Sequence, residues 1–336
     1  MTKKVLIIPS NLDAKAIVWL RCVLPAKYAD PNQFQVRILT KFPNNNGTID
    51  LSMFEWADCV VMQRFYEDNE FLRCLRKGYD LFEGVKLYES DDMVWDIPFK
   101  QIRAAYDKTK DFTERIIKEA DAITCTTKYF ANQFKEKFGK KKVFVIPNAL
   151  NRMNWDFPRQ EHDKVRVIYM AGGTHWKEVE FIKDIFNQVK KTHDIETYLL
   201  SPYYKEKEGE GFDHVYGFVP YENYAQFIRG ISPDISVAPL VEKTPFNFSK
   251  SEIKFIDGTL GGAVSVLEDC ETYDNVSNDA CVKAKTKKEW VNGIIKLCDK
   301  KTREDIFKLA NKEVNKKYII QSTIRLWEKA FKTKKQ

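Results

Sequence analysis

The sequence predicts an α/β protein built from two Rossmann-like domains that face each other across a cleft. The first 150 residues alternate short apolar runs with amphipathic helical patterns, which is typical of βαβ units around a mostly parallel sheet. A polar, proline-containing stretch at 149–164 interrupts this pattern, and the alternation then starts again. The length of 336 residues agrees with two domains of roughly 150 residues each.

In the first half, apolar runs rich in Val, Ile and Leu predict strands, and the segments between them carry helical spacing. The strands are expected at 4–10, 34–39, 59–64, 85–90, 122–127 and 143–148. The helices are expected at 15–29, 68–82, 108–119 and 128–138.

The second half repeats this order of strand and helix. Strands are expected at 165–172, 196–201, 214–219, 235–240 and 263–268, and helices at 177–191, 221–229 and 251–260. A last stretch at 288–332 has helical apolar spacing and is expected to pack against one or both domains. Its C-terminal helix is expected to pack back toward the N-terminal domain. The predicted boundaries are an N-terminal domain at 1–152, a C-terminal domain at 160–313 and a helical segment at 314–336.

Composition narrows the classes of function. The 55 Lys and Arg residues exceed the 48 Asp and Glu residues, and this net charge of +7 favours an anionic partner such as nucleic acid, a nucleotide or an anionic membrane. No run of 18 apolar residues occurs, so stable membrane insertion is not expected. The seven cysteines are scattered without metal-ligand spacing, which predicts reduced thiols in a cytoplasmic protein.

The segment "FNFSKSEIKFID" at 246–257 follows a buried strand and contains the start of a predicted helix. Backbone N–H groups at a helix start, with the hydroxyls of Ser249 and Ser251, can hold a diphosphate, and Lys250 adds a positive charge. Asp257, two turns into this helix, would be within reach of a ribose. The same residues fit an ordinary N-cap with a surface lysine equally well.

The segment "MAGGTHWKEVEF" opens the second domain at the end of its first strand. Gly172 and Gly173 allow a ligand to approach the backbone closely, and His175 and Lys177 offer cationic donors beside it. A pair of glycines also fits a tight turn with no ligand.

The segment "YESDDMVWDIP" ends a strand of the first domain in acidic residues. Asp91 and Asp92 can bind an acceptor, act as a general base or ligate a divalent ion, and an acidic loop that caps the next helix is the alternative. Arg64, at the end of another strand, can meet a phosphate or pair with these acids in a structural salt bridge.

Five segments in order resemble the retaining glycosyltransferases of the GT-B fold, family 4 and its relatives, including variants found in tailed phages. "WLRCVLPAKY" looks like "YYRxxLPA", and "VKLYESDDMVWDIP" resembles "YEIDDDLWDIP". "ADAITCTTKYFANQF…VFVIPNALN" is similar to "ADAITVSS…L…VxVIPNGID", and "YMAGGTHWKE" to "GGSTHxxD". "DISVAPLVEKTPFNFSKSEIKFID" resembles "DIGLAPLxDxPFNxxKSxIKFLE", so that the resemblance covers nearly the whole chain.

The resemblance implies a donor site in the C-terminal domain for a nucleotide-diphosphate sugar, specifically a UDP-sugar, with no further cofactor or metal required. Lys250 and Ser251 match the positions that hold the diphosphate, and Lys177 matches a phosphate-binding lysine. Asp257 stands where the family has a ribose-binding glutamate.

The resemblance also implies that "YGFVPYENY" covers the base, with Phe218 and Val219 in contact with it. Two positions depart from the family pattern. Asp257 replaces a glutamate and has a shorter reach to the ribose. Ser249 replaces the first acid of a paired-glutamate motif, so the contacts to the sugar are expected to differ.

The same residues lead to an expected mechanism of sugar transfer. Cations and a helix N-terminus can stabilise the leaving nucleotide diphosphate, while an oxygen of that phosphate helps to deprotonate the acceptor hydroxyl for attack on the same face. Asp91 or Asp92 would orient the acceptor, with Arg64 nearby. Closure of the two domains would exclude water.

The acceptor we expect is 5-hydroxymethylcytosine in double-stranded DNA, within a host cytoplasm if the protein is encoded by a phage. A flipped base needs aromatic and basic partners, and the candidates are Trp19, Arg21, Lys27, Tyr66 and Trp95. The alternatives are transfer to a cell-surface polysaccharide or lipid-linked precursor, with the helix at 15–29 as a basic face, and a non-catalytic protein that binds nucleotide sugar or DNA.

Overall fold

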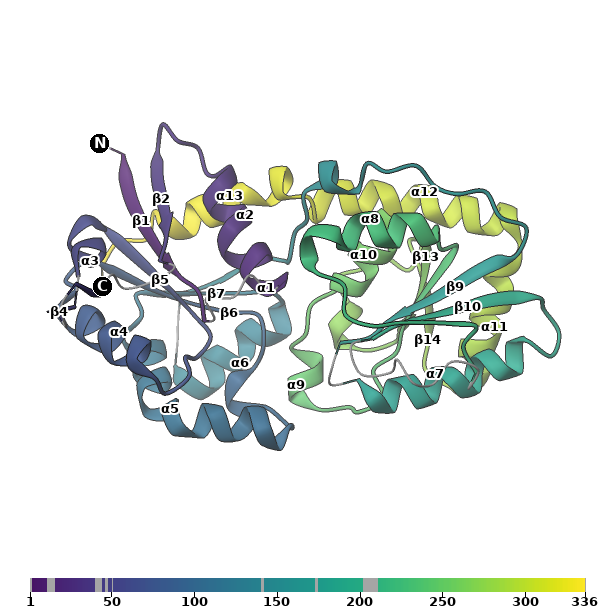
Figure 1. Ribbon diagram of the computed structural model, residues 1–336, viewed down its shortest axis with the longest axis horizontal. Helices are drawn as coiled ribbons and strands as arrows, with labels where there is room; N and C mark the ends of the chain where they lie inside the picture. The colour runs from purple at the N-terminus through teal and green to yellow at the C-terminus, as the bar shows by residue number, and fades with distance from the viewer. Residues whose placement is uncertain are drawn as a thin grey trace. The chain divides into compact units, whose positions relative to one another are not determined.

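The computed structural model describes residues 2–10, 16–39, 44–45, 48–49, 51–139, 142–172, 175–201 and 211–335. The chain divides into two compact units. Unit 1 comprises Met1–Asn148, Phe248–Ser251 and Ile320–Gln336, and unit 2 comprises Ala149–Asn247 and Glu252–Ile319. Each unit contains a parallel six-stranded sheet with helices on both faces (Figure 1), which confirms the predicted α/β class.

The sheet of unit 1 has the strand order β2-β1-β5-β6-β7-β8. Both faces of its central strands are buried, which explains why these strands read as unbroken apolar runs. The chain moves outward from β1 to β2 and then returns to β5, so the switch point of the sheet lies between β1 and β5. The strands are β1 (Lys3–Ile8), β2 (Phe34–Ile38), β5 (Cys59–Gln63), β6 (Val85–Ser90), β7 (Ala122–Cys125) and β8 (Val143–Val145), and a separate hairpin pairs β3 (Asn44–Asn45) with β4 (Thr48–Ile49).

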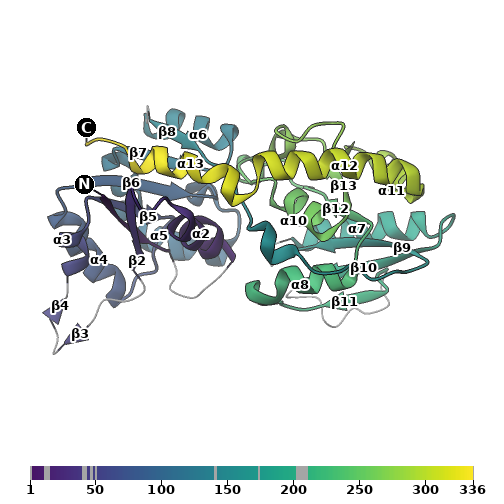
Figure 2. The same ribbon diagram turned by 90° about the horizontal axis from the view of Figure 1, so that it is seen from above.

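Helices cover both faces of this sheet. The face formed by Val5, Ile7 and Val61 packs against the N-terminal helical segment and α13, which contact each other in Figures 1 and 2. The opposite face, which includes Tyr88, packs against α6 through Phe134. The helices are α1 (Ala16–Val18), a π-helical turn (Trp19–Val23), α2 (Leu24–Tyr28), α3 (Ser52–Trp56), α4 (Glu70–Leu81), α5 (Lys100–Glu119), α6 (Lys128–Phe138) and α13 (Ile320–Phe331), with a short 3-10 turn at Val94–Asp96.

The sheet of unit 2 has the order β11-β10-β9-β12-β13-β14, and its switch point lies between β9 and β12. One face packs against α7 and α11 around Trp290, and the other is covered by α8, α10 and α12. The strands are β9 (Val165–Met170), β10 (Ile195–Leu200), β11 (His214–Tyr216), β12 (Ile235–Ala238), β13 (Val264–Glu268) and β14 (Val282–Ala284). The helices are α7 (Trp176–Val189), α8 (Tyr221–Ile231), α9 (Pro245–Phe248), α10 (Ile253–Gly261), α11 (Lys287–Cys298) and α12 (Lys300–Lys317), with 3-10 turns at Arg152–Trp155 and Glu271–Tyr273.

The predicted helix at 251–260 begins later than expected. In the structure α10 starts at Ile253, with Glu252 at its N-cap, and Ser249 to Ser251 precede the helix. The backbone of this preceding segment is grouped with unit 1 and not with the helix that follows it. Gly262, with a left-handed backbone φ of 101°, ends the helix after Gly261.

The C-terminal helical stretch consists of three helices, because two positions interrupt it. Asp299 ends α11 and caps α12 by accepting a hydrogen bond of 2.8 Å from the Thr302 N–H. The second interruption is at Ile319, between α12 and α13, where this residue forms a β-bridge with Leu150. The last helix, α13, belongs to unit 1. The C-terminal helix therefore returns to the N-terminal unit, as expected.

Candidate functional site

Three predicted site residues meet at the carboxyl edge of the first sheet. β5 and β6 pair with Gln63 opposite Glu89, so the residues that follow these strands start from the same edge. Arg64 binds Asp91 through two hydrogen bonds, one of them from Nη2 to Oδ2 at 2.6 Å, and its Nη2 also lies 2.7 Å from Oδ2 of Asp92. We call Arg64, Asp91 and Asp92 the edge cluster.

The backbone of Arg64 has an unusual conformation. Its φ of 54° is in the left-handed region, which few residues other than glycine adopt. The Arg64 N–H donates a 2.7 Å hydrogen bond to the carbonyl oxygen of Glu89, so the turn is fixed from the neighbouring strand. A strained residue at the switch point of a parallel sheet is a frequent feature of ligand sites.

Lys250 acts electrostatically on the edge cluster. Burial raises the pKa of the Asp92 carboxyl, and the nearby charge of Asp91 raises it further, whereas the charges of Arg64 and Lys250 act to lower it. The side chains of Arg64 and Asp92 are 24% and 29% exposed, so the cluster is accessible from solvent. The charge of Lys250 therefore acts on Asp92 within the same unit.

Residues 249 to 251 are attached to unit 1 at two points. The Thr127 hydroxyl donates a 3.3 Å hydrogen bond to the carbonyl oxygen of Ser249. The Asn148 side-chain amide donates a 2.8 Å hydrogen bond to the Ser251 hydroxyl. Sequence reasoning assigned no role to Asn148, although it lies in the "VIPNALN" segment that carries the family resemblance.

Beneath the edge cluster lies a buried ion pair. Arg21 and Glu89 are both fully buried and form two hydrogen bonds of 2.8 Å. Arg21 also donates a 2.7 Å hydrogen bond to the carbonyl oxygen of Ile146, and Glu89 accepts a 2.6 Å hydrogen bond from the Thr124 hydroxyl. Every charge of the pair thus has partners, as burial of charges requires.

In unit 2, the segment that follows β9 lies at the switch point of the second sheet. Gly172 is exposed, and a Cβ atom at this position would come within 3.3 Å of the His175 ring. Lys177 forms an ion pair with Glu242, which follows β12, so this contact joins the two sides of the switch point. Gly173 lies outside the described residues.

His175 is buried and faces an acid. Its Nδ1 lies 3.6 Å from Oε2 of Glu178, whose Oε1 accepts a 3.3 Å hydrogen bond from the Val241 N–H. Burial alone would raise the pKa of Glu178, but the hydrogen bond and charge of His175 more than offset it, so that the pKa is lowered. The acids Glu178 and Glu242, which sequence reasoning missed, thus hold both predicted cationic donors.

Asp257 forms a second polar group in unit 2. The Tyr224 hydroxyl lies 3.3 Å from its Oδ2 and 3.1 Å from the Met170 sulfur at the end of β9. Burial raises the pKa of Asp257 from 3.8 to about 7, although Tyr224 and the charge of Lys254 act to lower it. Tyr224 lies within the quoted "YGFVPYENY", and Lys254 lies three residues before Asp257 on the same helix, but neither was singled out from the sequence.

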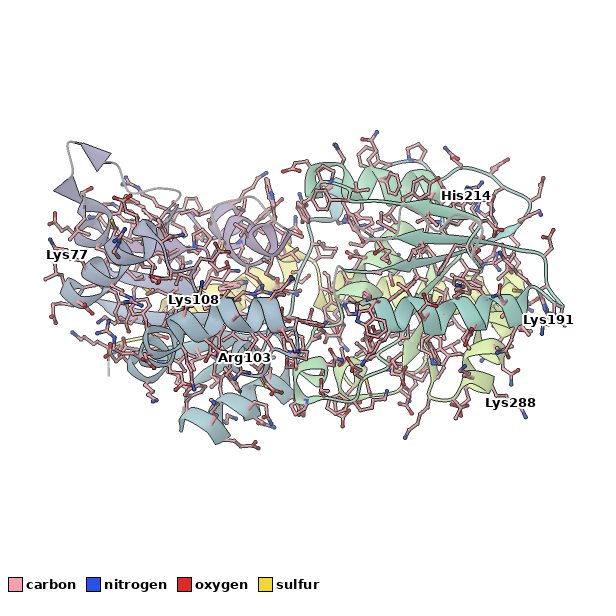
Figure 3. All side chains as sticks on the ribbon, turned by 60° about the horizontal axis from the view of Figure 1, so that its bottom comes forward. Lys77, Arg103, Lys108, Lys191, His214 and Lys288 are labelled. Carbon is pink, nitrogen blue, oxygen red and sulfur yellow. The ribbon has the colours of Figure 1, made fainter. Side chains whose placement is uncertain are left out.

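The predicted base-covering residues follow the edge strand β11. Phe218 is 76% exposed, and Val219 is half-buried. On β11 itself, the ring of His214 (labelled in Figure 3) stacks on Tyr198 with centroids 4.5 Å apart. His214 Nε2 lies 2.9 Å from Glu196 Oε1, so the ring of this histidine is held by neighbouring strand residues.

The prediction that Arg21 and Tyr66 hold a flipped base is wrong, because both side chains are buried. Arg21 is fully buried in the ion pair with Glu89, and Tyr66 is 2% exposed, with its hydroxyl donating to the carbonyl oxygen of Ile8. Neither can reach an acceptor. Trp95 is half-buried against phenylalanine rings of α6, Trp19 is half-buried in the π-helical turn, and Lys27 is exposed.

A cavity of about 510 Å³ lies elsewhere in unit 2, near the starts of β9 and β10 and the turn that contains Lys191 (Figure 3). Its charged side chains pair with one another, Lys164 with Asp194 at 3.0 Å and Lys190 with Asp213 at 2.8 Å. The cavity is at the amino-terminal edge of the sheet and does not coincide with the predicted donor residues.

Within the described ranges, no group of three or more His, Cys, Asp or Glu side chains is arranged to hold a metal ion. No helix in the same part of the chain is long and apolar enough to span a membrane. All seven cysteines are free thiols, six of them buried.

Comparisons with known proteins give matches among solved structures. No family model matches the sequence, and no curated protein matches it. Sucrose-phosphate synthase from Thermosynechococcus elongatus matches with a TM-score of 0.70 at 11% identity, over 98% of each chain. An alpha-glucosyltransferase in complex with UDP and a 13-mer DNA containing an HMU base matches with a TM-score of 0.66 at 9% identity, over 98% of this chain and 100% of the other.

TarM from S. aureus matches with a TM-score of 0.61 at 11% identity, over 87% of this chain. The chain spans 63% of the length of TarM. At these identities the likeness shows the fold alone. The two parallel sheets and their helices therefore have the GT-B architecture that the sequence predicted.

Proposed function

We propose that the protein is a retaining glycosyltransferase that moves a sugar from a UDP-sugar to an acceptor hydroxyl without a metal ion. One observation carries the proposal. The predicted polar residues follow the carboxyl ends of strands in two sheets of GT-B architecture, which is where open parallel sheets bind ligands. The HMU-containing DNA and UDP bound to one structural neighbour support the same class of reaction.

In the proposed donor site, Asp257 contacts the ribose and Phe218 and Val219 cover the base. Lys177, Lys250 and Ser251 bind the diphosphate. The ion pair between Lys177 and Glu242 implies that the phosphate displaces Glu242 from Lys177. An anionic diphosphate offers this lysine more charge than a single carboxylate, which favours the exchange.

The reaction breaks the bond between the sugar C1 and the phosphate oxygen and forms a bond between C1 and the acceptor oxygen. The electron pair of the broken bond stays on UDP, and a phosphate oxygen takes the proton of the acceptor hydroxyl. Lys250 and Lys177 stabilise the negative charge that develops on the leaving group. Asp91 or Asp92 orients the acceptor, with Arg64 holding the two carboxylates in place.

The proposed acceptor is a hydroxymethylated base in DNA, specifically 5-hydroxymethylcytosine. The net charge of +7 favours a polyanionic acceptor, and the DNA complex of the structural neighbour supports it. Trp95, Trp19 and Lys27 remain the candidates for contact with a flipped base, since Arg21 and Tyr66 are buried.

The test is a donor and acceptor screen read by mass spectrometry. The protein is incubated with a panel of nucleotide sugars and with DNA that contains either cytosine or 5-hydroxymethylcytosine, with and without a chelator. We expect a sugar mass on the hydroxymethylated DNA alone, with a yield unchanged by chelator. The anomeric configuration of the product, measured by NMR, tests retention.

Other outcomes separate the alternatives. Release of UDP without a DNA product would keep glycosyl transfer and assign a glycan or lipid acceptor. A yield that chelator abolishes would contradict metal independence. Donor binding without any transfer or UDP release would support a non-catalytic protein.

A further inference from the structure

A chain of hydrogen bonds within unit 1 connects the buried ion pair to the segment that contains Lys250. Arg21 Nη1 donates to the carbonyl oxygen of Ile146 at 2.7 Å and to Oδ1 of Asn148 at 3.4 Å. Asn148 Nδ2 then donates to the Ser251 hydroxyl at 2.8 Å. The amide of Asn148 therefore has its oxygen toward Arg21 and its nitrogen toward Ser251.

This arrangement fixes the orientation of Asn148. The guanidinium of Arg21 donates and cannot accept a hydrogen bond, so the amide oxygen must face it. Asn148 is 4% exposed, and the ring of Trp327 from α13 lies 4.7 Å from the Arg21 guanidinium carbon. Arg21 is thus held between Glu89 and Trp327, and the amide nitrogen of Asn148 is directed to Ser251.

The buried ion pair is better explained by orientation than by stability. Replacing a buried ion pair with well-packed apolar side chains is often neutral or stabilising, so such a pair is weak support for a purely stabilising role. Here the pair contacts two segments that lead to predicted site residues. Glu89 lies near the end of β6, and Asp91 and Asp92 directly follow this strand. Arg21 contacts residues 146 to 148.

We propose that Asn148 is a positioning residue that holds Ser251, and with it the adjacent Lys250, in the conformation that binds the donor diphosphate. This inference rests on the proposed function, since it assigns Asn148 to the same site. Asn148 acts through Ser251 and does not itself touch the ligand. Thr127, which donates to the Ser249 carbonyl oxygen, fixes the other end of the segment.

The experiment measures the affinity of the full chain for UDP by isothermal titration calorimetry. The variants are Asn148→Ala, Ser251→Ala, the double variant of both, and Lys250→Ala. Asn151→Ala is the matched control, because Asn151 is also buried and hydrogen-bonded but lies in unit 2 and caps a 3-10 turn. Thermal unfolding of each variant shows that it is folded at the temperature of the titration.

We expect Asn148→Ala to weaken UDP binding about fivefold, the effect of losing one hydrogen bond, and Asn151→Ala to leave it unchanged. Because Asn148 acts through Ser251, the double variant should bind UDP as Ser251→Ala does. A structural role alone would give no such coupling between the two positions.

The failure of this inference differs from failure of the proposed function. If wild-type protein binds UDP and Lys250→Ala weakens it, but Asn148→Ala binds as wild type does, the role of Asn148 is overturned and the donor site stands. Additive effects of Asn148→Ala and Ser251→Ala would also overturn it. Absence of UDP binding by the wild type would overturn the donor site and this inference together.

Discussion

Among single residues, Asp257 is an acid of the described part of the chain whose charge changes near neutral pH. Its pKa is raised to about 7 by burial, so between about pH 4 and 7 the folded protein holds a proton here that the unfolded chain has lost. The contribution of Asp257 to the free energy of unfolding therefore falls as the pH rises through this window.

We expect Asp257→Asn to be more stable than wild type above pH 7, by at most about 4 kcal/mol, and similar to wild type near pH 4. Asparagine stays neutral and keeps a partner for Tyr224, so it avoids the cost of the buried charge. Urea unfolding at several pH values measures the difference. Asp163→Asn, at an exposed position, serves as the control, and a difference independent of pH would contradict the expectation.

A second prediction for a single residue concerns Lys250. If it stabilises the leaving diphosphate, Lys250→Ala should lower kcat by about 10² to 10³, the usual effect of removing one group that stabilises transition-state charge. The loss of its charge should also raise the pKa of Asp92, because Lys250 acts to lower it. Kinetic assays as a function of pH measure both effects.

Lys288→Ala is the matched control for Lys250→Ala. Lys288 is exposed in the first turn of α11 (Figure 3). Its replacement by alanine removes the same charge from the whole molecule as Lys250→Ala does. Equal losses of kcat in the two variants would show that net charge alone explains the effect of Lys250.

The positions of three charged residues at strand ends could be read from the sequence, whereas their roles in a reaction stay predictions. Arg64, Asp91 and Asp92 were candidates because each follows a buried strand, and parallel strands bring such positions to one edge. Tyr224 and Asn148 were not found because their roles depend on contacts with residues distant in sequence, Asp257 and Ser251. No local pattern in the sequence encodes these partners.

At the scale of elements, α13 completes the core of unit 1. Trp327 is 1% exposed and packs with Phe331 and the N-terminal helical segment against one face of the sheet. We expect Trp327→Ala to destabilise unit 1 by about 3 to 5 kcal/mol, because it leaves a large cavity. Hydrogen exchange should then accelerate in β1 and β5 and remain unchanged in the strands of unit 2.

Trp290→Ala is the matched variant in unit 2. Trp290 is fully buried in the core cluster that includes strands β9, β12 and β13. We expect it to accelerate hydrogen exchange in those strands and to leave β1 and β5 protected. If each substitution accelerated exchange in both units equally, the two units would unfold together.

The elements that sequence predicted best are the strands buried on both faces, because such strands are unbroken apolar runs. β6 was also predicted with its observed bounds, Val85–Ser90, although Lys86 and Glu89 interrupt its apolar residues. The start of α5 at Lys100 was missed, because most of residues 100 to 107 are exposed and show no helical spacing of apolar residues. Their helical propensity favours the helix instead. β14 was missed because this edge strand has three residues and little apolar character.

At the scale of the whole molecule, the net charge of +7 allows the DNA acceptor to be tested without any mutation. Lysine and arginine contacts to DNA phosphates release counterions, so affinity falls steeply as salt concentration rises. A free 5-hydroxymethyl-deoxycytidine acceptor has no phosphate backbone and lacks this dependence.

We therefore expect KM for hydroxymethylated DNA to rise about tenfold or more between about 50 and 200 mM salt, the range expected for several phosphate contacts. KM for the free nucleoside should change much less over the same range, and UDP affinity measured in parallel corrects for salt effects on the donor. Equal salt dependence for DNA and nucleoside would mean that the positive charges do not contact the DNA backbone. The excess of lysine and arginine would then have no part in acceptor binding, and a neutral glycan acceptor would be favoured.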